Sequence, residues 1–210
     1  MTSVLDRLAV LRLVPVVVLD RVADAAPLGA ALKAGGLPCV EVTFRTPAAE
    51  AAIKEMSSDP SLLIGAGTVV RAEQVDAALN AGASFVVSPG FSLAVVRRCQ
   101  ELGVPVLPGV ATPSEVMMAL DAGLDAVKFF PAETNGGVPA LRAIAAPFAP
   151  MRFVPTGGVT ASNLPDYLAV PSVLAVGGSW MVAPKLVAAG NFDEVTRLTA
   201  EAVALVRAVA

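Results

Sequence analysis

The sequence of 210 residues contains no histidine, two cysteines, one tyrosine and one tryptophan. The lack of histidine excludes catalysis by a Ser-His-Asp or Cys-His arrangement, and also the usual transition-metal site. The two cysteines, Cys39 and Cys99, are too few for a disulfide framework and lack metal-ligand spacing, so we expect both in the core. Acid–base chemistry must therefore use aspartate, glutamate, lysine, cysteine or the single Tyr167.

Charged residues are also scarce, at 16% of the chain against 55% hydrophobic residues, and the formal net charge is −3. This composition excludes a disordered chain and offers no basic face for nucleic acid. Gly, Pro, Ser or Asn interrupt the long uncharged stretches 77–96 and 167–184, which argues against a membrane span. The apolar run at residues 13–19 is short and follows the acidic Asp6, unlike a signal peptide. We therefore expect a cytoplasmic protein without nucleic-acid or membrane partners.

Eight short apolar segments rich in Val, Leu, Ile and Phe recur along the chain, with starts about 20 to 26 residues apart. They are residues 13–19, 38–42, 62–65, 85–88, 105–108, 126–130, 152–155 and 172–176. Such runs suit strands that are buried on both faces. Alanine-rich amphipathic segments lie between them, for example residues 22–34, 48–56, 72–81, 93–102 and 114–122.

This alternation predicts the α/β class and a (β/α)8 TIM barrel that forms a single domain over residues 1–210. An open doubly wound sheet is the alternative, but eight segments and no GxGxxG motif after the first favour the barrel. Ala-Gly pairs predict Gly35, Gly82 and Gly123 as left-handed residues just past helix ends. The run Thr-Pro-Ser-Glu at 112–115 predicts a helix start with Thr112 as N-cap.

Barrel enzymes carry catalytic groups at the C-terminal ends of their strands, and strand side chains alternate between the two faces. The hydrophobic neighbours of Glu41 and of Lys128 suit the outer face, so Glu41 and Lys128 are expected to point inward. A desolvated lysine could attack a ketone, and Glu41 could act as the general acid–base group. The alternatives are a structural ion pair of Lys128 with Glu41 or Asp125, or a lysine that reaches solvent.

Further polar and glycine residues follow other predicted strands. Arg45 could bind a carboxylate through two N–H groups of its guanidinium, or it could form a surface ion pair. Thr68 could bind a ligand or stabilise a turn. Glycine pairs at 157–158 and 177–178 follow the seventh and eighth segments, where barrels commonly bind phosphate. Ser179 would add a hydroxyl donor, although plain tight turns would explain the glycine pairs as well.

Seven stretches together resemble the 2-keto-3-deoxy-6-phosphogluconate (KDPG) aldolase family, whose relatives include 4-hydroxy-2-oxoglutarate aldolase. They are EVTFRT at 41–46, GAGT at 65–68, SPG at 88–90, PGVATPSE at 108–115, KFFPAE at 128–133, PTGGV at 155–159 and GGSW at 177–180. Each stretch alone is weak, but seven in the family's order and spacing are specific. The resemblance runs from about Leu13 to the end of the chain.

The resemblance implies a class I aldolase of the Entner–Doudoroff route that releases pyruvate and D-glyceraldehyde 3-phosphate, needs no metal or cofactor, and forms a homotrimer. It implies Lys128 as the Schiff-base lysine and Glu41 as the proton shuttle. The other implied contacts are Arg45 and Thr68 for the substrate carboxylate, Pro89, Phe130 and Thr156 for the pocket walls, and Gly157, Gly158, Gly178 and Ser179 for the phosphate.

Two alternatives remain open at the level of sequence. A sister aldolase for 4-hydroxy-2-oxoglutarate, or for the epimeric 6-phosphogalactonate substrate, would use the same residues. A barrel that serves as a binding module or as an engineered assembly scaffold would need no chemistry at all. The intact Glu41, Lys128 and glycine pairs argue against this second alternative.

Overall fold

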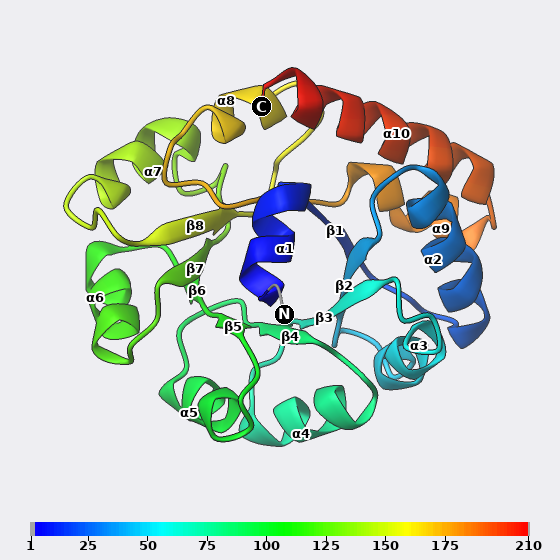
Figure 1. Cartoon of the computed structure of the whole chain (residues 1–210), viewed down its shortest axis with the longest axis horizontal. Coiled ribbons are helices and arrows are strands. Elements are labelled where there is room, and N and C mark those ends of the chain that lie inside the picture. Colours follow the sequence, from blue (N-terminus) through cyan, green and yellow to red (C-terminus); the bar gives the residue numbers. More distant parts are fainter. Residues whose placement is uncertain (1–2, 210) are drawn as a thin grey trace.

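The computed structural model describes residues 3–209, in which strands form a ring and helices surround it (Figure 1). The strands are β1 (Leu13–Val17), β2 (Cys39–Thr43), β3 (Leu63–Gly67), β4 (Phe85–Val87), β5 (Val106–Leu107), β6 (Gly109–Val110), β7 (Ala126–Phe129), β8 (Arg152–Pro155) and β9 (Val176–Gly178). The α-helices are α1 (Val4–Leu11), α2 (Ala25–Ala34), α3 (Ala49–Met56), α4 (Ala72–Asn80), α5 (Leu93–Glu101), α6 (Pro113–Asp121), α7 (Gly137–Ala145), α8 (Leu164–Leu168), α9 (Pro184–Ala188) and α10 (Phe192–Ala208), with 3-10 turns η1 (Val22–Asp24) and η2 (Trp180–Val182). Within the described range, no helix is both long enough and apolar enough to cross a membrane.

The ring is closed by two parallel ladders, in the orders β5-β4-β3-β2-β1-β9 and β6-β7-β8. Pro108 separates β5 from β6 because it has no N–H to donate, although its carbonyl accepts a 2.9 Å hydrogen bond from the Lys128 N–H. On the other side, parallel bridges join Phe153 to Val173 and Thr156 to Gly177. With β5 and β6 counted as one interrupted strand, residues 3–209 form the eight-stranded barrel that the sequence predicts.

Side chains alternate strictly between the barrel interior and the helix layer. On β2, Cys39 belongs to an inner cluster with Phe85 and Val154, whereas Val40 packs outward against the helices. On β7, Ala126 belongs to the same inner cluster, and its neighbours along the strand pack outward. The predicted parity of both strands is therefore confirmed, and it places Glu41 and Lys128 on the inner face.

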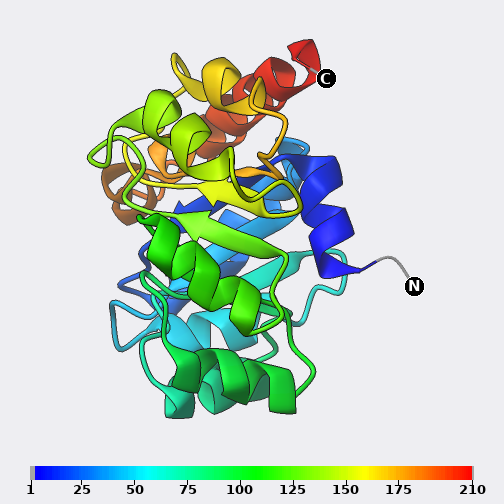
Figure 2. The ribbon, with the colours of Figure 1, turned by 90° about the vertical axis from the view of Figure 1, so that its left-hand side faces the viewer.

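Helix α1 closes the end of the barrel at which the strands begin. Its N-cap is Ser3, which forms a reciprocal capping box with Asp6, and Leu8 is fully buried against the inner cluster. Figure 1 shows α1 across the centre of the ring, and Figure 2 shows it at one end of the barrel. This helix was not among the predicted segments. It leaves only the opposite end, where the strands finish, for a ligand.

The five predicted helical segments correspond to α2 to α6, the first of them preceded by the turn η1. Gly82 and Gly123 have the predicted left-handed φ, at 103° and 76°. The prediction for Gly35 is wrong, because its φ is −74° and the left-handed residue is Gly36 at 85°. Gly35 is needed for a different reason: an added Cβ would lie 2.6 Å from Cβ of Thr199 on α10.

The eighth strand begins later than predicted, because β9 spans Val176–Gly178 and not residues 172–176. The second glycine pair therefore lies inside this strand and does not form a turn after it. A Cβ on Gly177 would lie 2.2 Å from Thr156 Oγ1, and one on Gly178 would lie 2.0 Å from the Trp180 ring. Close approach of these side chains, not a left-handed backbone, is why glycine occurs at both positions.

Candidate active site

Lys128 on β7 and Glu41 on β2 meet inside the barrel. Lys128 Nζ lies 3.2 Å from Glu41 Oε1, with only 7% and 4% of the two side chains exposed. The ammonium also lies 5.1 Å from the centre of the Phe130 ring, within the range of a cation–π contact. The other predicted partner, Asp125, pairs instead with Arg152 at 2.5 Å. The alternation of side chains along the strands predicted that Lys128 and Glu41 would both point into the barrel. The structure shows that the two side chains are in direct contact.

Two glycines of β3 provide the space for this contact. A Cβ on Gly67 would lie 2.3 Å from Glu41 Oε1, so any larger residue would displace the carboxylate. A Cβ on Gly65 would lie 2.2 Å from the Phe85 ring, which fills the barrel beside it. The Gly-Ala-Gly run of β3 is thus explained by the side chains that cross the barrel interior.

A buried ion pair of this kind is poorly explained by stability alone. Desolvation costs several kcal/mol per ion, which the attraction between the charges offsets only with excellent geometry. The same arrangement is useful for chemistry, because it holds an amine beside a proton acceptor in a space with little water. The pair is therefore a candidate nucleophile with a candidate acid–base partner.

The other candidate nucleophiles and ligands among the described residues are less suited to this chemistry. Burial raises the pKa of Cys39 and of Cys99 to about 12, so both thiols stay protonated near neutral pH. Both are buried, as the sequence predicted. Within residues 3–209, no group of three or more His, Cys, Asp or Glu side chains is placed to hold a metal ion. Among the described residues, Lys128 is therefore the best-placed candidate nucleophile inside the barrel.

The predicted carboxylate contacts, Arg45 and Thr68, meet where β2 and β3 end. Arg45 Nε donates a 3.2 Å hydrogen bond to Thr68 Oγ1. Thr68 has a φ of 58°, a left-handed conformation that residues other than glycine rarely adopt. Such strained residues concentrate at functional sites. The structure therefore brings these two side chains together on the rim of the barrel.

A cavity of about 310 Å³ opens at the C-terminal ends of the strands. Seven of the predicted site residues line it: Arg45, Phe130, Thr156, Gly157, Gly158, Gly178 and Ser179. Gly157 and Gly158 have φ of 100° and 81°, so this turn requires glycine at both positions. Phe130 and Thr156 follow the ends of β7 and β8, so the cavity lies just beyond the Lys128–Glu41 pair along the strands.

Four predicted site residues do not line this cavity: Lys128, Glu41, Thr68 and Pro89. Pro89 follows β4, and its carbonyl oxygen would lie 2.2 Å from a Cβ on Gly109, so Pro89 packs against the start of β6. Sequence reasoning had also missed several lining residues: Val16, Val18, Val159, Val182 and Pro184. These are apolar side chains without a chemical signature. Only strand parity could have indicated the inward direction of Val16 and Val18.

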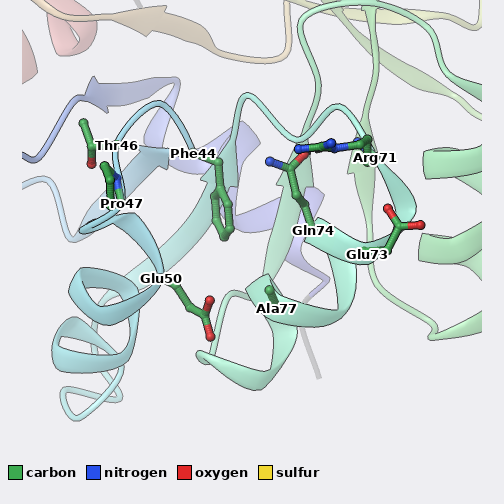
Figure 3. A pocket seen from close by; sticks show the side chains of 8 residues that line it. All are labelled: Phe44, Thr46, Pro47, Glu50, Arg71, Glu73, Gln74 and Ala77. Carbon is green, nitrogen blue, oxygen red and sulfur yellow. Dashed lines mark hydrogen bonds between the residues drawn. The ribbon is translucent and has the colours of Figure 1, made fainter.

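A larger hollow, of about 670 Å³, lies outside the barrel between α3 and α4 (Figure 3). The residues Phe44, Thr46, Pro47, Glu50, Arg71, Glu73, Gln74 and Ala77 line it. Figure 3 shows Arg71 and Gln74 along one side and Glu50 on α3 facing Ala77 on α4. None of the predicted catalytic or phosphate-binding residues belongs to this hollow, so size alone does not identify the site.

Comparisons with known proteins agree with this geometry. The family model "KDPG and KHG aldolase" matches residues 4–198. A 2-dehydro-3-deoxy-phosphogluconate aldolase of Treponema pallidum is 48% identical over 98% of this chain and 99% of its own. The Zymomonas mobilis KDPG aldolase, solved with 3-phosphoglycerate, superposes with a TM-score of 0.91 at 44% identity, over 100% of this chain and 99% of its own.

A second solved relative, the KDPG aldolase of Legionella pneumophila, holds pyruvate captured as a covalent carbinolamine intermediate. It superposes with a TM-score of 0.90 at 40% identity and covers 93% of this chain and 96% of its own. The match to the family model spans most of the chain, and the relatives match nearly all of it. The chain therefore belongs to the KDPG and KHG aldolase family.

Proposed function

We propose that this barrel is a class I aldolase that cleaves KDPG into pyruvate and D-glyceraldehyde 3-phosphate. The observation that carries the proposal is the buried contact of 3.2 Å between Lys128 Nζ and Glu41 Oε1. An amine nucleophile needs a neighbour that can exchange protons with it, and this geometry supplies one. The covalent pyruvate adduct in the Legionella relative supports the same chemistry.

The reaction begins when the neutral amine of Lys128 attacks the C2 ketone to give a carbinolamine. Glu41, protonated by transfer from the Lys128 ammonium, donates that proton to the former ketone oxygen, whose loss as water leaves a protonated imine and a Glu41 carboxylate. Glu41 then takes the proton of the C4 hydroxyl, the C4 carbonyl forms, and the C3–C4 bond breaks. Its electrons move to the imine and give an enamine, and the aldehyde leaves. Glu41 returns the proton to C3, and hydrolysis of the imine releases pyruvate and free Lys128.

Substrate binding uses groups away from the breaking bond, whose binding energy can orient the ketone. Arg45 and Thr68 bind the carboxylate, since a guanidinium fork matches carboxylate geometry. The phosphate is bound in the cavity that Arg45 also lines, by Gly157, Gly158, Gly178 and Ser179. Phe130 and Thr156 form walls, and a wall role for Pro89 stays a prediction.

Borohydride trapping tests the nucleophile directly. Incubation with pyruvate and reduction should leave an adduct about 72 Da heavier on the nucleophilic lysine. Peptide mapping should find it on Lys128, with Lys33, Lys54 and Lys185 as unmodified internal controls. An adduct only on the other lysines, or none with folded protein, would reject the Schiff-base mechanism.

The choice of substrate within the family is part of the proposal. The left-handed turn Gly157–Gly158 favours a phosphorylated substrate over 4-hydroxy-2-oxoglutarate. Rates on KDPG, on its galactonate epimer and on 4-hydroxy-2-oxoglutarate rank the three. A higher kcat/KM on 4-hydroxy-2-oxoglutarate would assign the sister activity.

The homotrimer is likewise a proposal, supported by exposed apolar side chains on α5 and α6. Leu93 on α5 and Met118 on α6 are exposed and line a hollow of about 450 Å³ together with Phe91. A closed threefold ring joins two different patches of each copy. We assign the second patch to the hollow in Figure 3 that contains Phe44. Light scattering should give three copies for the parent chain and one for Met118→Asp, and a monomeric parent would refute the assembly.

One domain over residues 1–210 and a cytoplasmic location stay predictions. The barrel occupies the described range, 3–209, and the family model matches 4–198. Limited proteolysis tests the first prediction, because a single domain should resist cleavage between its elements. Fractionation of the source cells tests the second.

A further inference from the structure

A tyrosine and a glutamate outside the cavity connect the lysine-bearing strand to the glycine turn. Glu133 follows β7, and its backbone N–H donates a 3.0 Å hydrogen bond to the Gly157 carbonyl. Its carboxylate accepts a hydrogen bond from the hydroxyl of Tyr167 on α8. Tyr167 is fully buried, so its ring is fixed within the core. Neither residue lines the cavity at the barrel mouth.

The side chain of Glu133 packs directly against Gly158 in the glycine turn and against Gly137 at the start of α7. A Cβ on Gly158 would lie 2.6 Å from Cβ and Cγ of Glu133. On the other side, a Cβ on Gly137 would lie 3.2 Å from Glu133 Oε1 and 3.6 Å from the Tyr167 hydroxyl. The Glu133 side chain therefore occupies a slot between the turn and the start of α7, and Tyr167 holds its end.

We propose that Glu133 and Tyr167 are positioning residues that hold the Gly157–Gly158 turn in its phosphate-binding conformation. This inference rests on the proposed function, because it concerns how that site recognises a phosphate. The Tyr167 hydroxyl fixes the orientation of the Glu133 carboxylate. A freely rotating carboxylate beside the turn would repel a phosphate dianion and leave the turn free to move.

The Tyr167 hydroxyl can donate its hydrogen bond to Glu133 over a wide pH range. Burial, and then the hydrogen bond to Glu133, raise the pKa of Tyr167 well above its usual value. The hydroxyl thus remains a donor throughout the range in which the enzyme would be assayed. Since Tyr167 is the only tyrosine of the chain, its ultraviolet titration reports this group alone.

The variant Tyr167→Phe keeps the ring and removes only the hydroxyl. We expect KM for KDPG to rise about five- to tenfold, with kcat within about twofold of the parent. The unphosphorylated substrate 2-keto-3-deoxygluconate should show no such rise. Glu133→Gln keeps an acceptor oxygen, so its effect should be smaller than that of Glu133→Ala. An unchanged KM for KDPG, or equal rises for both substrates, would overturn the proposal.

Two measurements separate this role from simple loss of stability. Asp125→Asn removes the ion pair with Arg152 near the other end of the same strands, and should lower Tm without a difference between the two substrates. Inorganic phosphate should inhibit the parent competitively, and its inhibition constant should rise in Tyr167→Phe together with KM. If it stays constant, the pair does not position the phosphate turn.

Pyruvate trapping distinguishes a failure here from a failure of the proposed function. Pyruvate carries no phosphate, so reduction should label Lys128 equally in the parent and in Tyr167→Phe. An unlabelled parent would reject the aldolase mechanism itself. Equal labelling of both, with no change in KM for KDPG, would reject only the positioning role.

Discussion

The two ends of the barrel interior are built from the same strands but differ in chemistry. Where the strands begin, Leu8 of α1 seals an apolar cluster that includes Phe85 and Leu107. A few residues further along, the inner face carries the buried Glu41–Lys128 pair, and then a cavity. We therefore expect the closed end to contribute mainly to stability and the open end to carry the proposed activity. Substitutions at the two ends should therefore separate the two properties.

The largest effect is expected at the open end, from Lys128→Ala. Loss of the nucleophile should lower kcat by about 10⁴-fold or more, because the remaining groups cannot form the imine. Steady-state rates on KDPG measure this loss, and circular dichroism verifies the fold. Near-parent turnover would show that another group is the nucleophile.

The opposite result is expected at the closed end, from Leu8→Ala. Removal of this fully buried side chain should lower the free energy of unfolding by about 3 kcal/mol. Below the unfolding transition, kcat and KM should match the parent. Denaturant unfolding and kinetics on the same preparation measure both. A large loss of kcat in the folded variant would mean that the ends are coupled.

The variant Gly67→Ala tests the Glu41–Lys128 contact, which lies between the two ends of the barrel interior. The added Cβ would lie 2.3 Å from Glu41 Oε1, so the carboxylate must move away from Lys128. We expect kcat to fall about 30-fold, through loss of the acid–base partner. Gly90→Ala is the matched control, because a Cβ there meets no atom within 4 Å. Equal kinetics for the two variants would contradict the role of this contact.

The smallest effect is expected on the outer rim of the closed end. A hydrogen bond from Lys33 is the main reason that the pKa of Asp59 is lowered from 3.8 to about 2. An acid with a depressed native pKa stabilises the fold above its unfolded pKa and loses this contribution as pH falls. Asp59→Asn should therefore be slightly less stable than the parent at pH 7, and this difference should vanish between about pH 4 and pH 2. Thermal unfolding across that range provides the measurement, and a constant difference would contradict it.

Local patterns in the sequence predicted the features that depend on neighbours along the chain. Thr112 caps α6 with Glu115 as predicted, because a capping box needs only a spacing of three residues. The inward direction of Glu41 and Lys128 followed from the period of a strand, and the structure confirms it. The seven family stretches then identified the family, which the comparisons confirm.

Features that depend on distant contacts could not be predicted in this way. The glycines of β9 resemble a turn in sequence, and only the Thr156 and Trp180 side chains packed against them explain their place in a strand. The Glu133–Tyr167 hydrogen bond joins residues 34 positions apart that share no period or motif. Helix α1 packs against strand residues that are distant in the sequence. Its position across the end of the barrel could therefore not be predicted from its own residues.

The closure of one end by α1 has a consequence for the order of events in catalysis. A barrel with a single entrance admits the substrate and releases both products through the same opening. In the proposed mechanism, the phosphorylated aldehyde would lie nearer the opening, and pyruvate would stay attached to Lys128 behind it. The aldehyde must therefore depart first and pyruvate last, so that pyruvate competes directly with fresh substrate for the empty lysine.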